Sequence, residues 1–177
     1  SGTPVEIGNP ERVRTWSVCR KKFDERVVGK SIDAGADIWL SSYPEDAEIG
    51  PDSALLHVNK DGETVEVECK LICGCDGAHS WVRRKFRFGR PKEMMVGFQV
   101  EVTGYPGVEG VLDMYTGSSI APGFFAWAIP SGSTTRIGMW SRPDLLDESS
   151  CESLLGKLMN DSIWSERFSQ CRIVGKF

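Results

Sequence analysis

The chain has 177 residues, of which 40% are hydrophobic and 26% are charged, as is typical of a globular protein with its own core. The formal net charge of −4 argues against nucleic acid as a partner, because phosphate binding requires a basic surface. No apolar run approaches the roughly 20 residues of a membrane helix, and the first residues lack the apolar stretch of a signal peptide. We therefore expect a cytoplasmic protein of ordinary domain size.

The six cysteines do not indicate a metal site. Cys73 and Cys75 share one face of an expected strand, and no second pair of cysteines or histidines has matching spacing. We expect the cysteines to be reduced and mostly buried, and we expect no bound metal.

The first half of the chain combines one helix with short strands. Phe23, Val27 and Ile32 recur on one helical face, and Gly35 is a natural end for that helix. Polar and apolar residues alternate after a turn at 59–62, which predicts a hairpin with one solvent-exposed face. In chain order we expect an extended segment (3–20), a helix (21–35), a strand (36–40), a polar loop (41–52), hairpin strands (53–59 and 63–71) and a buried strand (71–75).

The second half reads as an antiparallel sheet followed by a helix. Four strand-like runs rich in aromatic residues are separated by Gly, Pro and Ser, and Ser149 and Glu152 have the spacing of a capping box. We expect strands at 94–102, 110–117, 123–130 and 134–140 and a helix at 149–168. The fold class is thus α/β passing into α+β. A parallel strand at 71–75 needs parallel neighbours, and only 36–40 offers one, so we expect that at least one βαβ unit is missing.

The turn at Asp76-Gly77 is the first candidate site. It follows the expected buried strand and precedes a basic helix, so Asp76 would lie at the carboxyl edge of the sheet, where ligands bind. Gly77 would let a ligand approach the backbone, and the helix start would favour a phosphate. The alternative is a simple strand-to-helix turn in which Asp76 caps the helix.

The run from Gly74 to Arg83, "GCDGAHSWVR", resembles the middle motif of the flavoprotein hydroxylase-like FAD enzymes, G-x-D-G-x-x-S-x-V-R. The segment from Val18 to Leu40 is similar to that family's strand, arginine and helix, with Arg20 at the arginine position. The resemblance implies FAD as the cofactor, Asp76 close to the FAD ribose, Gly77 allowing its approach, and Arg20 near the flavin. For Arg20 a solvated basic residue is an equal alternative.

A third segment, "APGFFAWAIPSGSTTRIGMW", resembles the geranylgeranyl reductase branch, which has an aromatic-x-Trp-x-Phe-Pro signature. Phe125, Trp127 and Pro130 match it, with Phe125 in place of Tyr and Ile129 in place of Phe. The resemblance implies that Phe125, Trp127 and Pro130 line a pocket for an isoprenoid chain, whereas aromatic residues on strands otherwise belong to a core. Further candidates for this pocket are Met95, Phe98, Met114 and Tyr115.

The family's first motif, G-x-G-x-x-G, and its third, G-D-A, do not occur here, so we expect an internal fragment that does not retain FAD. Residues 3–90 would form part of the FAD-binding α/β portion and residues 91–177 the substrate-binding portion with its antiparallel sheet. The resemblance implies a parent that reduces C=C bonds of a geranylgeranyl chain.

The alternatives are an FAD-dependent aromatic hydroxylase and an inert binding domain. The partners that we consider are an apolar substrate, NAD(P)H or ferredoxin as electron donor, a membrane surface, and self-association through apolar surface.

Overall fold

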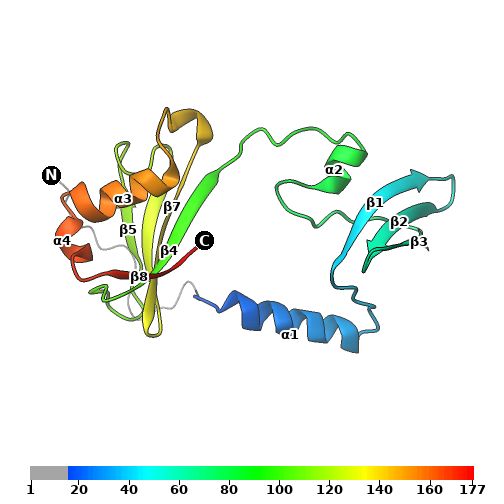
Figure 1. Cartoon of the computed structure of the whole chain (residues 1–177), viewed down its shortest axis with the longest axis horizontal. Helices are drawn as coiled ribbons and strands as arrows, with labels where there is room; N and C mark the ends of the chain where they lie inside the picture. Colours follow the sequence, from blue (N-terminus) through cyan, green and yellow to red (C-terminus); the bar gives the residue numbers. More distant parts are fainter. Residues whose placement is uncertain (1–15) are drawn as a thin grey trace. The chain divides into compact units, whose positions relative to one another are not determined.

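The computed structural model describes residues 16–177, so most of the expected extended segment 3–20 lies outside the described residues. The chain forms two compact units, one of residues 18–91 and the other mainly of residues 92–177 (Figure 1). Each unit contains an antiparallel sheet together with helices. This mixture confirms the expected fold class, although neither sheet contains a parallel pair of strands among the described residues.

The first unit begins with α1 (Arg20–Asp33), which confirms the expected helix. Gly35 follows its end with a φ of 92°, a left-handed conformation that glycine adopts without strain. No residue of α1 is buried, and Phe23 and Ile32 are 52% and 54% exposed. Phe23 and Ile32 are nine positions apart, which at about 100° per residue places them on opposite sides of the helix, so the expected single apolar face does not form. The apolar side chains of α1 are instead exposed on both sides of it.

The sheet of this unit has the order β1–β2–β3, with strands β1 (Ser42–Ile49), β2 (Ala54–Lys60) and β3 (Glu63–Cys69). The expected hairpin is confirmed, because β2 and β3 pair from Ala54 with Cys69 to Lys60 with Glu63. Asp61 and Gly62 make the two-residue turn with φ values of 54° and 92°. Positive φ at both positions is the geometry that matches the twist of a tight hairpin.

Strand β1 corrects the prediction of a loop at 41–52. The polar residues and Pro44 suggested a loop, but Pro is tolerated on an edge strand, and β1 is an edge of this sheet. Its register shifts between Pro44 and Asp46, so the ladder with β2 continues past the proline through an irregularity.

The strands expected at 36–40 and 71–75 do not form. Both segments lack strand structure, and Leu71 is 76% exposed. A strand exists through its ladder with a neighbour, and no described segment pairs with either of these. The prediction of mostly buried cysteines was also wrong, since Cys19, Cys73 and Cys75 are exposed and only Cys151 is buried.

The second unit is built on a five-stranded antiparallel sheet with the order β5–β6–β7–β4–β8. All four expected strands are present, and β8 at the end of the chain adds a fifth that pairs with β4. The strands are β4 (Val96–Thr103), β5 (Asp113–Thr116), β6 (Phe125–Ser131), β7 (Thr134–Ser141) and β8 (Arg172–Lys176).

Helix α3 (Cys151–Asp161) lies across one face of this sheet (Figure 1). Leu154, Leu155 and Leu158 of α3 join a buried cluster with the inward residues of the strands. Ala126 and Ala128 of β6 are completely buried there, and their small side chains let the helix approach closely. The remaining members of the buried cluster are Val100, Val102, Tyr115, Ala121, Ile137, Met139, Cys151 and Phe168.

The single helix expected at 149–168 is two helices, α3 and α4 (Ser165–Phe168). Ser162 lies at the break, where its Oγ donates to the carbonyl of Leu158 (2.6 Å) and accepts from the N–H of Trp164 (3.0 Å). Such local bonds compete with helical ones. The capping box also differs from the prediction, because Ser150 and Ser153 form it. A short 3₁₀ turn, η1 (Pro143–Leu145), precedes α3.

Candidate functional site

Asp76 lies five residues before the start of α2 (Trp81–Lys85) and contacts its first turn. Its Oδ2 accepts hydrogen bonds from the backbone N–H groups of Trp81 (2.6 Å) and Val82 (3.2 Å). The Ser80 Oγ accepts from the N–H of Arg83, so two side chains together satisfy the free N–H groups of the helix start. The capping alternative for Asp76 is thus observed.

The same contacts keep Asp76 ionised. The Ser80 hydroxyl, and then the backbone N–H groups of Val82 and Trp81, lower the pKa of this exposed carboxyl below its usual value. Gly77 has a φ of 76°, and a Cβ at this position would meet nothing within 4 Å. The backbone beside the carboxylate is therefore open to a second molecule.

An apolar pocket of about 200 Å³ adjoins this turn. It lies between the segment before α2 and the strands β1 and β2. Its lining consists of Ser42, Tyr43, Pro44, Leu56, Val58, Ile72, Cys73, Gly74, Cys75, Asp76, Trp81 and Val82. Asp76 is the one acidic side chain of this lining, so a negative charge borders an otherwise uncharged pocket.

Arg20 is not brought to this turn by any described contact. Its guanidinium binds the carboxylate of Asp24, one helical turn along α1, at 3.1 and 3.2 Å. The Arg20 side chain is 74% exposed, and no hydrogen bond or ion pair links it to Asp76 within residues 16–177. The geometry is that of a solvated pair on a helix surface, and a role for Arg20 at a cofactor stays a prediction.

The aromatic side chains of β6 lie on the sheet face opposite α3. Phe125 and Trp127 alternate with the buried Ala126 and Ala128, as the period of two predicts. By the same alternation Pro130 belongs to the face of the two alanines, so the structure does not bring it together with the aromatic pair. Of the further candidates, Met114 pairs with Trp127 across the ladder and is 57% exposed, whereas buried Tyr115 belongs to the core, against which Phe98 also packs.

Two more aromatic residues extend this face, and the sequence prediction missed them. Trp140 of β7 packs edge-to-face on Trp127 with ring centroids 5.4 Å apart, and Phe124 stacks on Phe125 at 4.5 Å. The ring centroids of Phe124 and Trp140 are 5.7 Å apart, so all four rings belong to one cluster of contacts. We call Phe124, Phe125, Trp127 and Trp140 the aromatic surface.

Glycines on the neighbouring strands make room for the two indoles. Trp127 is paired with Gly138 across the ladder, and Trp140 is paired with Gly97. A Cβ at Gly138 would lie 2.5 Å from Cζ2 of Trp127, and a Cβ at Gly97 would overlap the ring of Trp140. The alternation of Gly138 and Trp140 in β7 is the sequence signal that could have revealed this arrangement.

The indole nitrogen of Trp127 is buried and has no acceptor among the described residues. A buried N–H without a partner is uncommon in folded proteins, because it loses the hydrogen bonds that water would provide. Because this nitrogen is buried, it is not accessible to a molecule that lies on the aromatic surface.

A polar cluster that sequence reasoning also missed links β5 to α4. The Tyr105 hydroxyl donates to Asp113, lies 2.7 Å from the Tyr115 hydroxyl, and neighbours Arg167, whose Nη2 donates to Asp113 at 2.8 Å. Burial, and then the bond to Asp113, raise the pKa of Tyr105 well above its usual value. Both tyrosines therefore stay neutral, and the cluster holds β5 and α4 together.

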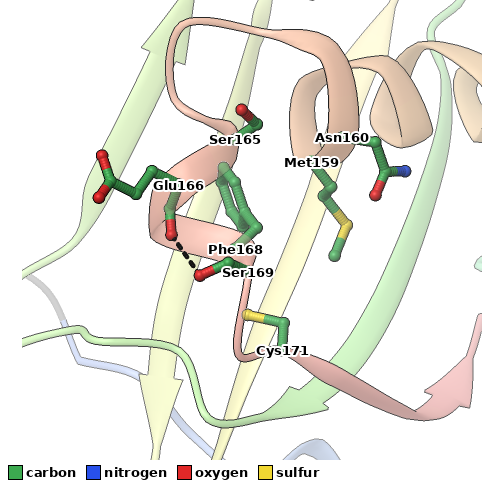
Figure 2. Close-up of a pocket in the computed structure, with 7 residues that line it drawn as sticks. All are labelled: Met159, Asn160, Ser165, Glu166, Phe168, Ser169 and Cys171. Atoms are coloured by element: carbon green, nitrogen blue, oxygen red, sulfur yellow. Dashed lines mark hydrogen bonds between the residues drawn. The ribbon is translucent and has the colours of Figure 1, made fainter.

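A pocket of the second unit has a volume of about 400 Å³ and lies where α3, α4 and the start of β8 meet (Figure 2). Its lining is Met159, Asn160, Ser165, Glu166, Phe168, Ser169 and Cys171. The Ser169 hydroxyl is bonded to the carbonyl of Glu166 at 2.8 Å, and burial raises the pKa of the Cys171 thiol. A protonated thiol is a poor nucleophile, and this pocket brings together no catalytic arrangement.

Comparison with known protein families identifies the chain as a flavoprotein. The FAD binding domain family matches residues 31–136, and the chain belongs to this family. FAD is accordingly its cofactor class, as expected. The residues of the turn fit such a group, because an ionised carboxylate stands beside a glycine with free space around it.

The chain is also similar to several named proteins. It is 28% identical to digeranylgeranylglycerophospholipid reductase 2 of Methanothermobacter thermautotrophicus, over 90% of this chain and 43% of the relative. The crystal structure of a geranylgeranyl bacteriochlorophyll reductase-like protein from Thermoplasma acidophilum matches 89% of this chain and 40% of its own, with a TM-score of 0.74 and 19% identity. The anhydrotetracycline hydroxylase OxyS of Streptomyces rimosus has the same fold, with a TM-score of 0.62 and 17% identity over 90% of this chain and 32% of its own.

These comparisons confirm the expected resemblance to geranylgeranyl reductase-like flavoproteins. The chain spans less than half the length of the relatives that it matches. Between residues 16 and 177 no helix has both the length and the apolar character needed to cross a bilayer.

Proposed function

We propose that the chain is an internal fragment of a larger FAD-dependent oxidoreductase that reduces carbon–carbon double bonds of an isoprenoid chain. The reductases named among its relatives support this assignment, and its partial coverage of them supports a fragment. In this proposal residues 3–90 supply part of the FAD side and residues 91–177 supply the substrate side. The exposed apolar side chains of α1 are the kind of surface that further parts of such a protein would cover.

The observation that carries the proposal is the aromatic surface on the sheet face away from α3. Ligand pockets are mostly apolar, and this face offers four aromatic rings to an apolar chain. The methyl-branched chain of an isoprenoid would lie against Phe125, Trp127 and Trp140. Pro130 would act less directly, because it stands near the end of β6 on the opposite face.

On the FAD side, Asp76 would accept a hydrogen bond from a ribose hydroxyl while it still caps α2. Gly77 would allow the nucleotide to approach, and Arg20 would leave Asp24 to lie near the flavin. The chemistry that FAD supplies when bound and reduced is hydride transfer to one carbon of the double bond, with a proton from solvent completing the other carbon. NAD(P)H or ferredoxin is the external electron donor in this proposal.

The test uses the intact protein, loaded with FAD. Its reduced form is mixed without oxygen with a geranylgeranyl lipid, and mass spectrometry should show one hydrogen molecule added for each bond reduced. Trp127→Ala should raise KM about tenfold, since an aromatic contact contributes about 1.5 kcal/mol. Trp39→Ala is the matched control, because Trp39 belongs to the other unit, beside Lys60.

An aromatic hydroxylase is the second candidate, and the shared fold with OxyS favours it. The same preparation is therefore also supplied with NADPH, oxygen and a phenol. Oxygen-dependent turnover of the phenol, with the lipid left unchanged, would overturn the reductase proposal.

A further inference from the structure

Residues 83–90, "RRKFRFGR", concentrate positive charge in an otherwise acidic chain. Five of these residues are Arg or Lys, two are Phe, and none is acidic, while the whole chain has a formal net charge of −4. We call this stretch the basic segment. It begins in α2 with Arg83, the last residue of the FAD-family motif, and continues beyond the helix. The proposed reductase function assigns no task to the residues after Arg83.

The backbone of Arg87 has a conformation that is unusual for an arginine. Helix α2 ends with two bonds, from the N–H of Phe88 to the carbonyl of Arg83 (2.9 Å) and from the N–H of Arg87 to the carbonyl of Arg84 (3.3 Å). This pattern places Arg87 in the left-handed conformation, with a φ of 55°, where glycine is the usual residue. An arginine is strained there. Glycine would avoid this strain, so the presence of an arginine suggests that its side chain has a function.

The charges of the basic segment are largely uncompensated. Lys85 forms an ion pair with Asp46, whereas Arg87 and Arg90 have no acidic partner in the described part of the chain. The guanidinium groups of Arg83 and Arg84 contact backbone carbonyls, which leaves their full charge in place. Arg87 and Arg90 are both exposed. They come just after the last turn of α2, which already contains three cationic side chains.

An exposed aromatic side chain accompanies these cations. Phe88 is 63% exposed, although its ring centroid lies 6.2 Å from that of the half-buried Phe86. Phe86 in turn packs edge-to-face on Trp81 at 6.4 Å, so contacts between rings connect Phe88 to the start of α2. A large apolar side chain held among arginines is the composition of segments that lie in a membrane interface.

We infer that the basic segment binds the anionic surface of a lipid bilayer, with Arg87 and Arg90 at the headgroup phosphates and Phe88 in the boundary with the acyl chains. Cationic side chains near an anionic leaflet each add to the affinity, and a buried apolar ring adds more. A nucleic acid duplex would satisfy the same charges but would leave the exposed ring of Phe88 in water. The inference does not rest on the reductase proposal, since bilayer binding would hold whatever the reaction.

Vesicle flotation tests this inference with the 177-residue chain. Vesicles of phosphatidylcholine are compared with vesicles in which part of that lipid is replaced by phosphatidylglycerol, and flotation separates bound protein from aggregates. The chain should float with the anionic vesicles, and added salt should release it. Arg87→Gln with Arg90→Gln should lower the partition coefficient about 30-fold, from the typical contribution of a cation near such a surface.

Lys21→Gln with Lys22→Gln is the matched control, because it removes the same charge from exposed positions of α1 in the same unit. Phe88→Ser tests the apolar part separately and should weaken binding without changing its salt dependence. Circular dichroism confirms that each variant is folded. Equal binding to neutral vesicles, or an equal loss in the α1 control, would overturn the inference. So would tighter binding to double-stranded DNA than to anionic vesicles.

Discussion

Replacing Gly138 with alanine tests whether the aromatic surface depends on the glycine beneath it. The added Cβ would lie 2.5 Å from Cζ2 and 2.8 Å from Cε2 of Trp127, and 3.1 Å from the carbonyl oxygen of Phe98. Carbon atoms in contact are about 3.5 to 4.0 Å apart, so the indole must move by about 1 Å. Overpacking of this kind costs about 1 to 3 kcal/mol. We expect Gly138→Ala to destabilise the second unit by about 2 kcal/mol.

Urea unfolding, followed by far-ultraviolet circular dichroism and by tryptophan fluorescence, measures this loss. Gly156→Ala is the control, because Gly156 lies in α3 and a Cβ there would meet nothing within 4 Å. Alanine in a helix interior is more favourable than glycine by about 1 kcal/mol, so the control should be stabilised. Unchanged stability and an unchanged emission spectrum in Gly138→Ala would refute the packing of Trp127 over this glycine.

Three further predictions concern the turn before α2, the end of α2, and the polar cluster. The bonds to Asp76 lower its folded-state pKa, so its contribution is present above the unfolded pKa and lost as the pH falls through the folded one. Asp76→Asn should therefore lose stability near neutral pH and show less acid-dependent loss than the parent chain, measured as urea midpoints across pH. Arg87→Gly should stabilise α2 by about 0.5 kcal/mol in thermal unfolding, because relief of the left-handed arginine outweighs the entropy of glycine. Tyr105→Phe should cost about 1 to 2 kcal/mol in urea unfolding, because it leaves Asp113 and Arg167 without a hydroxyl partner.

Local patterns were enough to predict most of the strands. One example is the hairpin of β2 and β3, which are neighbours in the sequence. It is specified by the Asp61-Gly62 turn and by the alternation around Val65 and Val67. The alternation of aromatic residues and alanines in β6 likewise predicted the two faces of that strand. In these cases the chain itself contains both partners of the ladder.

Prediction failed where the outcome depends on distant partners. The apolar run at 71–75 has the composition of a buried strand, but no described segment pairs with it. Strand β1 was missed for the opposite reason, because pairing with β2 overrides its polar composition and Pro44. For the candidate site, the sequence predicted a role for Phe125 and Trp127, but it could not show that Trp140 from another strand packs against them. That contact depends on the ladder register of β6 and β7.

The pairing of each indole with a glycine has a consequence for protein engineering. Gly97 and Gly138 leave no room for a side chain, so variation at these positions would change the surface only by disrupting it. Met114 and Thr116 on the adjacent strand pair with Trp127 and Phe125, and both are exposed. If the aromatic surface binds the substrate as proposed, a library that aims to change the substrate should keep the two glycines and vary β5. Larger or smaller side chains there would change the size of the apolar surface without moving the aromatic rings.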